Sequence, residues 1–327
     1  MKPTEVLLLS GLLLALCLTS LFALWRRANR IQSAVAGAPR IRWTYTPGSS
    51  PLSGIALAPN GTIHFAAADG IYALSPEGRL LWKSPLPSGP VVAAPTLAPS
   101  GRLYAACQSG MLFALDASGN LIWQSVSTQP WRTMTRSTSP TTTPICLRLH
   151  RGWAPTSIGN IEGHNPVWLF AIGRDGKQRW MVRPSNVLRG SPVVDDTGVI
   201  YFCDSDFVKA ILPDSQSHWY LRSDCNSGPA LAADGTLYLG TNGSEEKQGP
   251  RKSFLTGFTP DGHLKWKIEI HGMVRDAPAI ASDGTIFFTT DKGYAYAISD
   301  AGSPPMDSPW PRFQHDAQNS GRVQVYR

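Results

Sequence analysis

The sequence predicts an all-β protein, about a six-bladed β-propeller of four-stranded blades, preceded by one transmembrane helix. Six times along the 327-residue chain, a small residue is followed five positions later by a turn residue, and in five of these sets a tryptophan stands four positions further on. Turn glycines are 40 residues apart from Gly61 to Gly101, 37 from Gly198 to Gly235 and 49 from Gly235 to Gly284, and four strands in roughly 40–50 residues are typical of a propeller blade. The six sets are Ala73, Gly78, Trp82; Ala114, Gly119, Trp123; Ala171, Gly176, Trp180; Ala210, Ser215, Trp219; Gly257, Gly262, Trp266; and Ala297, Gly302, with Met306 in the tryptophan position.

Each repeat contains four predicted strands. In the last repeat, a short apolar strand at 277–281 precedes a β-branched and aromatic run at 285–290, and an alternating run follows at 294–298. Turns with glycine, which allows positive φ, separate these runs. In the other repeats a fourth strand carries the tryptophan. We expect the small residue to let neighbouring blades approach and the tryptophan to fill the space between them.

An N-terminal strand is predicted to close the ring. The sixth repeat lacks its tryptophan strand, whereas Ile-Arg-Trp-Thr-Tyr at 41–45 looks like a fourth strand without the preceding three. If this segment completes the last blade, the exposed sheet edge of an open array disappears. The propeller is therefore predicted to span residues 41–306, with a C-terminal flanking segment at 307–327.

An apolar segment precedes the repeats. After an N-terminal tail at 1–5, residues 6–25 carry no charge and are long enough to cross a bilayer as a helix. A basic juxtamembrane linker follows at 26–40. A cleaved signal peptide and a lipoprotein are the alternatives. They are disfavoured because the small residues at 34–36 lie far beyond the apolar run and Leu16 precedes Cys17.

Several runs carry a resemblance to a known family. They are Asp-Gly-Thr-Ile-Phe-Phe…Gly-Tyr-Ala-Tyr-Ala-Ile at 283–298, its relatives at 61–74, 101–115 and 235–239, and the segment at 308–322. At these columns the chain resembles the pyrroloquinoline-quinone-like (PQQ-like) repeat family. The resemblance implies a propeller, but the family includes quinone-dependent dehydrogenases, the lipoprotein of the outer-membrane assembly machinery and proteins without an assigned activity. The fold alone does not choose among them.

Two observations disagree about the side of the membrane on which the propeller lies. The arginines around residues 26–42 favour a cytoplasmic propeller by the positive-inside rule, whereas the resemblance favours an extracytoplasmic one. We expect a single-pass cell-membrane protein with the propeller outside the cytoplasm. Most of the net charge of +7 lies near the apolar segment. This distribution favours contact with anionic lipid head groups and argues against nucleic acid as a partner.

The sequence shows no pattern of chemistry-bearing residues from which a catalytic, cofactor or metal site is predicted. The five cysteines lack metal-ligand spacing. Cys203 and Cys225 could pair within one blade region, but buried free thiols are the favoured interpretation. Asp204-Ser205-Asp206 lacks the glycine and distal glutamate of a calcium loop. The seven histidines are scattered and are expected at the surface or in turns.

One set of residues is a candidate binding site. Arg189, Asn226 and Arg275 occupy one column, three positions before the first-strand proline of three successive blades. They are predicted to lie side by side at the mouth of the central channel, where they could hold an anionic group or a partner carboxylate. Solvated loop residues are the alternative interpretation.

These observations favour a non-catalytic binding or scaffold module for an unidentified protein partner over an enzyme. No cofactor is predicted. Two other functions stay open. One is a quinone-dependent dehydrogenase-like enzyme. The other is a carbohydrate- or polymer-binding propeller that uses aromatic residues such as Trp131, Trp153 and Trp168.

Overall fold

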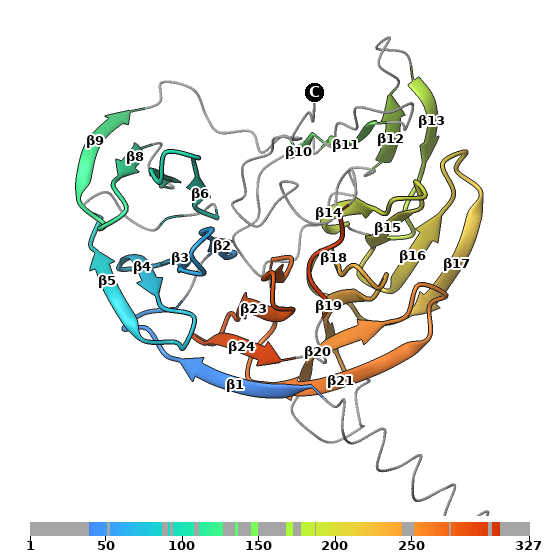
Figure 1. Ribbon diagram of the computed structural model, residues 1–327. Coiled ribbons are helices and arrows are strands. Elements are labelled where there is room, and N and C mark those ends of the chain that lie inside the picture. Colours follow the sequence, from blue (N-terminus) through green and yellow to red (C-terminus); the bar gives the residue numbers. More distant parts are fainter. Residues whose placement is uncertain are drawn as a thin grey trace, which may run out of the picture. The chain divides into compact units, whose positions relative to one another are not determined.

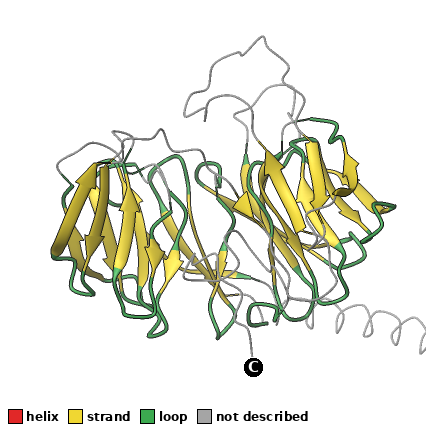
Figure 2. Ribbon diagram, turned by 90° about the horizontal axis from the view of Figure 1, so that it is seen from above, coloured by secondary structure: helices red, strands yellow, loops and turns green. Residues whose placement is uncertain are grey.

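The computed structural model describes most of the repeat region. Every regular element in it is a strand (Figure 2), so the predicted all-β class is confirmed. The described residues contain no helix with the length and apolarity needed to cross a bilayer, and the predicted anchor at 6–25 lies outside them. The described ranges are 39–50, 53–86, 91, 94–107, 111–126, 135–136, 145–149, 168–172, 178–186, 188–243, 252–274, 276–299 and 303–307.

Within these ranges the strands form six four-stranded antiparallel sheets, here called sheets 1 to 6. Sheet 1 contains β2 (Ala56–Leu57), β3 (Ile63–Ala67), β4 (Gly70–Leu74) and β5 (Leu80–Ser84). Sheet 2 contains β6 (Thr96–Leu97), β7 (Leu103–Ala106), β8 (Met111–Leu115) and β9 (Leu121–Val126). Sheet 3 contains β10 (Thr135–Arg136), β11 (Ile145–Leu149), β12 (Trp168–Ile172) and β13 (Gln178–Val182).

Sheet 4 contains β14 (Arg189–Val194), β15 (Ile200–Cys203), β16 (Phe207–Ile211) and β17 (Ser217–Arg222). Sheet 5 contains β18 (Ala230–Leu231), β19 (Leu237–Asn242), β20 (Ser253–Phe258) and β21 (Leu264–Ile270). Sheet 6 contains β22 (Ala279–Ile280), β23 (Thr285–Thr289), β24 (Ala295–Ser299) and the N-terminal strand β1 (Arg40–Tyr45).

The N-terminal strand pairs with the last strand of the repeats. β1 lies antiparallel to β24, with Trp43 opposite Ala297 and Tyr45 opposite Ala295 (Figure 1). Sheet 6 is therefore built from both ends of the repeat region. The segment at 41–45, which was predicted to complete the last blade, is the fourth strand of this sheet.

The tryptophan of each repeat lies directly opposite the small residue of the third strand. Trp82 is opposite Ala73, whereas Leu80 is opposite Leu74, so that Leu81 is an extra residue in the fourth strand. The same β-bulge, which re-aims the neighbouring side chain, precedes the tryptophan in all six described sheets. The extra residues are Arg42, Leu81, Ile122, Arg179, His218 and Lys265.

The tryptophans also join neighbouring sheets, as predicted. The indole Nε1 of Trp82 donates a hydrogen bond to the Ala117 carbonyl oxygen in sheet 2, at 3.0 Å. Trp43, Trp180 and Trp219 make the equivalent bond, to Pro76, Pro213 and Pro260, at 2.7–2.8 Å. Each acceptor lies two residues before the turn residue between the third and fourth strands of the next sheet.

The turn glycine beside each indole is needed for two reasons. Gly119 has a φ of +83°, and a Cβ built on it would lie 2.5 Å from the Trp82 ring. Gly78 and Gly262 have the same relation to Trp43 and Trp219. Any side chain at these positions would be strained and would push the indole away. Sheet 4 is the exception, because Ser215 occupies the position with a φ of +76°.

The hydrophobic core lies between neighbouring sheets. One cluster joins sheets 6 and 1, where Trp43 and Tyr45 pack against residues that include Phe65, Tyr72 and Phe287. Other clusters join sheets 1 and 2, sheets 4 and 5, and sheets 5 and 6. At these junctions the sheets depend on their neighbours for burial, as expected of repeat architecture.

Candidate functional site

Arg189, the first residue of the predicted site, begins β14 and is exposed. Its Nε donates a hydrogen bond to the Ser205 Oγ at 2.9 Å, in the turn between β15 and β16. This contact fixes the root of the guanidinium group near the second turn of sheet 4. A planar, permanently charged group held in this way suits recognition of a carboxylate or phosphate.

Asn226, the second residue, is partly buried and makes contacts within the protein. Its side-chain amide lies 2.8 Å from Asn242 Oδ1, and with the amide turned over its nitrogen lies 2.7 Å from the Val274 carbonyl oxygen. It therefore bridges sheet 5 to the segment that enters sheet 6. Arg275, the third residue, lies outside the described residues, so the three-residue site stays a prediction.

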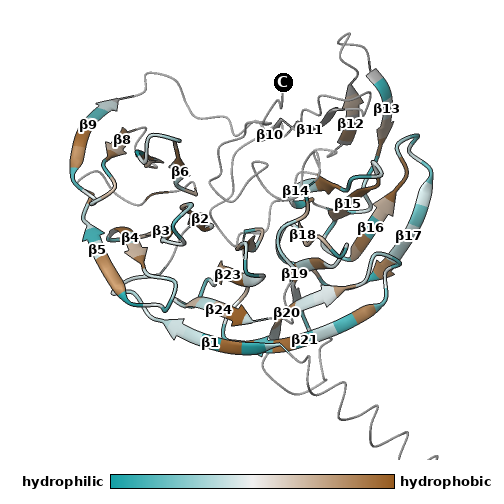
Figure 3. Cartoon of the chain, in the orientation of Figure 1, coloured by the Kyte–Doolittle hydropathy of each residue, from teal (hydrophilic) through white to brown (hydrophobic). Residues whose placement is uncertain are grey.

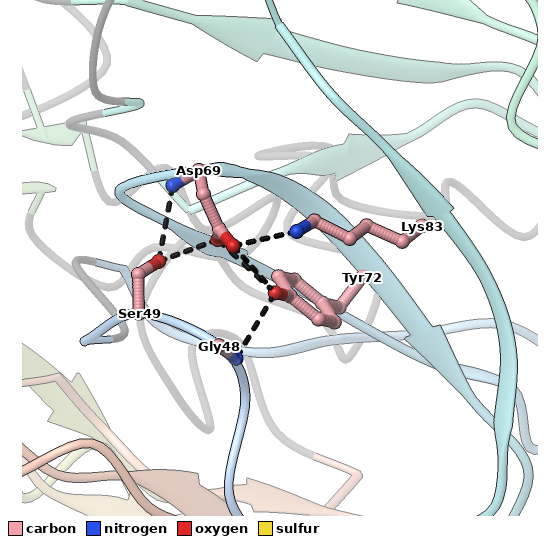
Figure 4. A network of polar contacts seen from close by, with 5 residues as sticks. All are labelled: Gly48, Ser49, Asp69, Tyr72 and Lys83. Atoms are coloured by element: carbon pink, nitrogen blue, oxygen red, sulfur yellow. Dashed lines mark hydrogen bonds and ion pairs between the residues drawn. The ribbon is translucent and has the colours of Figure 1, made fainter.

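The structure shows a second set of polar residues that the sequence analysis did not single out. Asp69 lies in the turn between β3 and β4, and its carboxylate accepts hydrogen bonds from Lys83 Nζ at 2.6 Å, from Tyr72 Oη at 2.9 Å and from Ser49 Oγ (Figure 4). The Gly48 amide donates to Tyr72 Oη at 3.2 Å. The network holds the segment that leaves β1 for sheet 1.

The electrostatics of this network favour the ionised carboxylate. Burial raises the pKa of Asp69, but the hydrogen bonds from Lys83, Ser49 and Tyr72 outweigh burial and lower the pKa to about 2. Asp69 therefore stays negatively charged at neutral pH and balances Lys83.

Two other sheets use an aspartate at the same turn. In sheet 4 the fully buried Asp204 accepts hydrogen bonds from the Ser185 and Phe207 amides at 2.9 and 3.0 Å and pairs with Lys209 at 2.7 Å. In sheet 6 the Asp291 carboxylate accepts from the Met273 amide at 2.8 Å. Each aspartate captures the chain that arrives from the preceding sheet. The recurrence of Asp at the second turn was the sequence signal for this role.

These contacts explain the carboxylate pair at 204–206. Asp204 is fully engaged in fixing the backbone, and Asp206 accepts a hydrogen bond from Asn186 Nδ2 at 3.0 Å. Among the described residues, no group of three His, Cys, Asp or Glu side chains has a geometry that could hold a metal ion.

Comparison with known proteins accords with the repeat pattern. The PQQ-like family model described as "Outer membrane protein assembly factor BamB" matches residues 24–145. Residues 24–145 are therefore similar to PQQ-like β-propeller repeats. A solved structure named as a candidate gluconolactonase is similar, with a TM-score of 0.50 and 14% identity over 83% of this chain and 94% of that chain. BamB from Moraxella catarrhalis has a TM-score of 0.32 and 12% identity over 79% and 87%. A search of curated proteins found no match.

A disulfide joins two neighbouring sheets. Cys203 and Cys225 are bonded, with Cα atoms 6.3 Å apart, which is within the usual range. The expectation of two free thiols is therefore wrong. Cys203 ends β15 in sheet 4, whereas Cys225 forms a bridge with Thr241 of β19 in sheet 5. The bond links neighbouring sheets, whereas the sequence analysis considered only a single blade region. Cys107 is free and buried.

His64 is a buried histidine on β3 of the first repeat. It is 4% exposed, its ring lies 5.6 Å from the Trp82 ring, and its Nδ1 has no hydrogen-bond partner among the described residues. Burial lowers the pKa of His64 to about 4, so the imidazole is neutral at pH 7. The expectation of a surface or turn histidine is wrong here, although His218 and His263 are exposed.

Proposed function

We propose that this protein is a membrane-anchored scaffold that binds a protein partner through its propeller. The observation that carries the proposal is the match of residues 24–145 to the family model described as an outer-membrane assembly factor. The carboxylates at the second turns support it. Asp69, Asp204 and Asp291 are engaged in holding the chain between sheets, which is a structural use of acidic residues.

The proposal includes a closed ring of six blades. Pairing of β1 with β24 supports closure, because the first and last strands of the repeat region share a sheet. The hydrogen bond from the Trp43 indole to the Pro76 carbonyl oxygen joins sheet 6 to sheet 1. A ring closed by strands from both chain ends has no free sheet edge at its seam.

The proposal also places the propeller outside the cytoplasm, beyond a helix at residues 6–25. The Cys203–Cys225 disulfide supports this side, because structural disulfides form and persist in oxidising compartments. The arginines at 26–42 weigh against it by the positive-inside rule, although a very short N-terminal tail permits either orientation.

Photo-cross-linking from position 189 tests the scaffold role. A benzoylphenylalanine replaces Arg189 in the full chain, and a matched probe replaces Ser217, an exposed residue at the start of β17. In intact membranes, we expect a discrete protein adduct from position 189 and none from position 217. Identical adduct patterns from both probes would remove the mouth as a binding site, and no protein adduct at either would contradict the scaffold role.

The competing enzyme function has its own readout. Pyrroloquinoline quinone and calcium added to the purified chain should leave the melting temperature unchanged if the propeller is a scaffold. A rise of several degrees would instead favour the quinone-dependent enzyme, since a ligand that binds only the folded state stabilises it.

A further inference from the structure

The β-bulge column differs between the sheets in a way that points to a second surface. In sheets 5 and 6 the bulge residue is a cation that binds the first turn of its own sheet. Lys265 Nζ lies 2.9 Å from Asp234 Oδ2, and Arg42 Nη1 lies 3.3 Å from Asp283 Oδ2. A charged bulge residue with an acidic partner is an ordinary solvated pair.

Sheets 1 and 2 have aliphatic bulge residues instead. Leu81 is 54% exposed and Ile122 is 44% exposed. Each follows another exposed leucine, Leu80 at 47% and Leu121 at 49%. Figure 3 shows the resulting hydrophobic stretches on β5 and β9. We call these four residues the apolar rim. Single exposed leucines are common, but paired aliphatic residues on two neighbouring outer strands indicate a surface that something covers.

The apolar rim lies at the same end of the outer strands as the predicted tether. Arg40 begins β1, Leu80 begins β5 and Leu121 begins β9. The turn before β5 contacts β1 through the Trp43–Pro76 bond, and the turn before β9 contacts β5 through the Trp82–Ala117 bond. The chain that comes from residues 6–25 therefore enters the propeller beside the apolar rim.

The tether is short and basic. Residues 26–39 comprise 14 residues (39 − 26 + 1) and include Arg26, Arg27 and Arg30. A chain of this length spans at most about 50 Å. It keeps the start of β1 within that distance of the bilayer and raises the effective concentration of the lipid surface.

Exposed basic side chains accompany the apolar rim. Arg40 lies at the start of β1, Arg79 immediately precedes Leu80, and Arg102 lies in the turn between β6 and β7; all three are exposed. Aliphatic residues beside arginines suit an anionic bilayer surface. The side chains can enter the head-group region while the guanidinium groups pair with phosphates.

We propose that the apolar rim of Leu80, Leu81, Leu121 and Ile122 docks onto the anionic leaflet of the membrane that holds the anchor. The proposal rests on the anchor of the proposed function. Docking fixes this end of the outer strands against lipid. The occupant is a lipid surface, because the rim lies at the end of the outer strands where the short tether joins β1.

Photo-cross-linking to lipid tests the docking. The full chain is reconstituted in nanodiscs with or without phosphatidylglycerol, with benzoylphenylalanine at position 81 or 122. The control probe replaces Tyr220 of β17, which is 68% exposed. We expect lipid adducts, detected by intact mass, at 81 and 122 in anionic nanodiscs, with a yield about fivefold above that at 220. Equal yields at the three positions, or a cross-linked dimer or another protein in place of lipid, would overturn the proposal.

A charge variant separates docking from a local effect of the probe. With the probe at 81, Ile122→Glu should lower the lipid-adduct yield, since it places a carboxylate against anionic head groups. His218→Glu changes the equivalent bulge position of sheet 4 and should leave the yield unchanged. The same loss from both variants, or from neither, would contradict docking through the apolar rim.

Alkaline extraction distinguishes failure of the anchor from failure of the docking. If the chain resists extraction but position 81 gives no lipid adduct, the anchor stands and the rim proposal falls. If alkaline extraction releases the chain, the anchor of the proposed function falls, and the rim proposal falls with it.

Discussion

Removal of the Cys203–Cys225 disulfide should destabilise the propeller substantially. The two cysteines are 22 residues apart, and a cross-link over a loop of this length stabilises by about 3 kcal/mol through restriction of the unfolded chain. Both side chains are 1% exposed, so the double variant Cys203→Ala/Cys225→Ala also loses core packing. Because the bond joins sheets 4 and 5, the loss should weaken one inter-sheet junction.

The assay is thermal unfolding of the full chain in detergent, with and without reductant. A loss of about 3 kcal/mol corresponds to a fall in Tm of roughly 5–10 °C in a chain of this size. Reductant should lower the Tm of the wild-type chain by a similar amount and leave the double variant unchanged. Cys107→Ala is the matched control, because Cys107 is buried but free, and it should keep the reductant sensitivity. A wild-type Tm that neither reductant nor the double substitution lowers would refute the reasoning.

Three further predictions concern the network, the buried histidine and the turn residues. Burial lowers the pKa of His64 to about 4 from about 6.5 in the unfolded chain, so the free energy of unfolding should fall by about 3 kcal/mol as the pH falls from 6.5 to 4. In urea titrations, the stability of His64→Phe should depend less on pH over this range than that of the wild type. Asp69→Ala should lower the free energy of unfolding by about 1–2 kcal/mol at pH 7. Because the pKa of Asp69 is lowered to about 2, the difference in stability between variant and wild type should shrink only as the pH falls from about 4 toward 2. A constant difference in stability across that range would count against the network. Ser215→Gly should stabilise the protein by about 0.5–1 kcal/mol because Ser215 has a positive φ. Gly119→Ala should destabilise it by more than about 1 kcal/mol because the added Cβ would meet the Trp82 ring. Calorimetry that reversed the sign of either effect would contradict this account of the turns.

Much of the fold could be predicted because the same pattern of strands, turns and tryptophan recurs in successive repeats. The strands, the turn glycines and the tryptophan between sheets all follow from spacing. The pairing of Trp43 with Ala297 follows from counting one missing and one surplus strand. The β-bulge before each tryptophan did not follow, because it depends on register between strands, and a period of two along one strand does not contain that information.

The polar and buried groups were harder to predict because their roles arise between sheets. Asp69 reads as part of an Asp-Gly turn, and its second role appears only when Ser49 arrives from sheet 6. Spacing did not show whether Cys203 and Cys225 pair, because the bond depends on the junction of sheets 4 and 5. Strand alternation did not reveal that Trp82 covers His64. Of the predicted site, Asn226 contacts protein groups within the fold, and the grouping with Arg189 and Arg275 still awaits a test.

Closure of the ring by β1 is the claim on which both the scaffold and the docking of the apolar rim depend. It can be tested with a cysteine pair at Arg40 and Ser299, which lie opposite each other in β1 and β24. Oxidation of Arg40→Cys/Ser299→Cys should give a faster-migrating monomer in non-reducing electrophoresis with an undiminished Tm. Arg40→Cys/Ser217→Cys, which places the second cysteine on β17, should give none. If the first pair does not cross-link, or cross-links no better than the second, the N-terminal strand does not complete the last sheet.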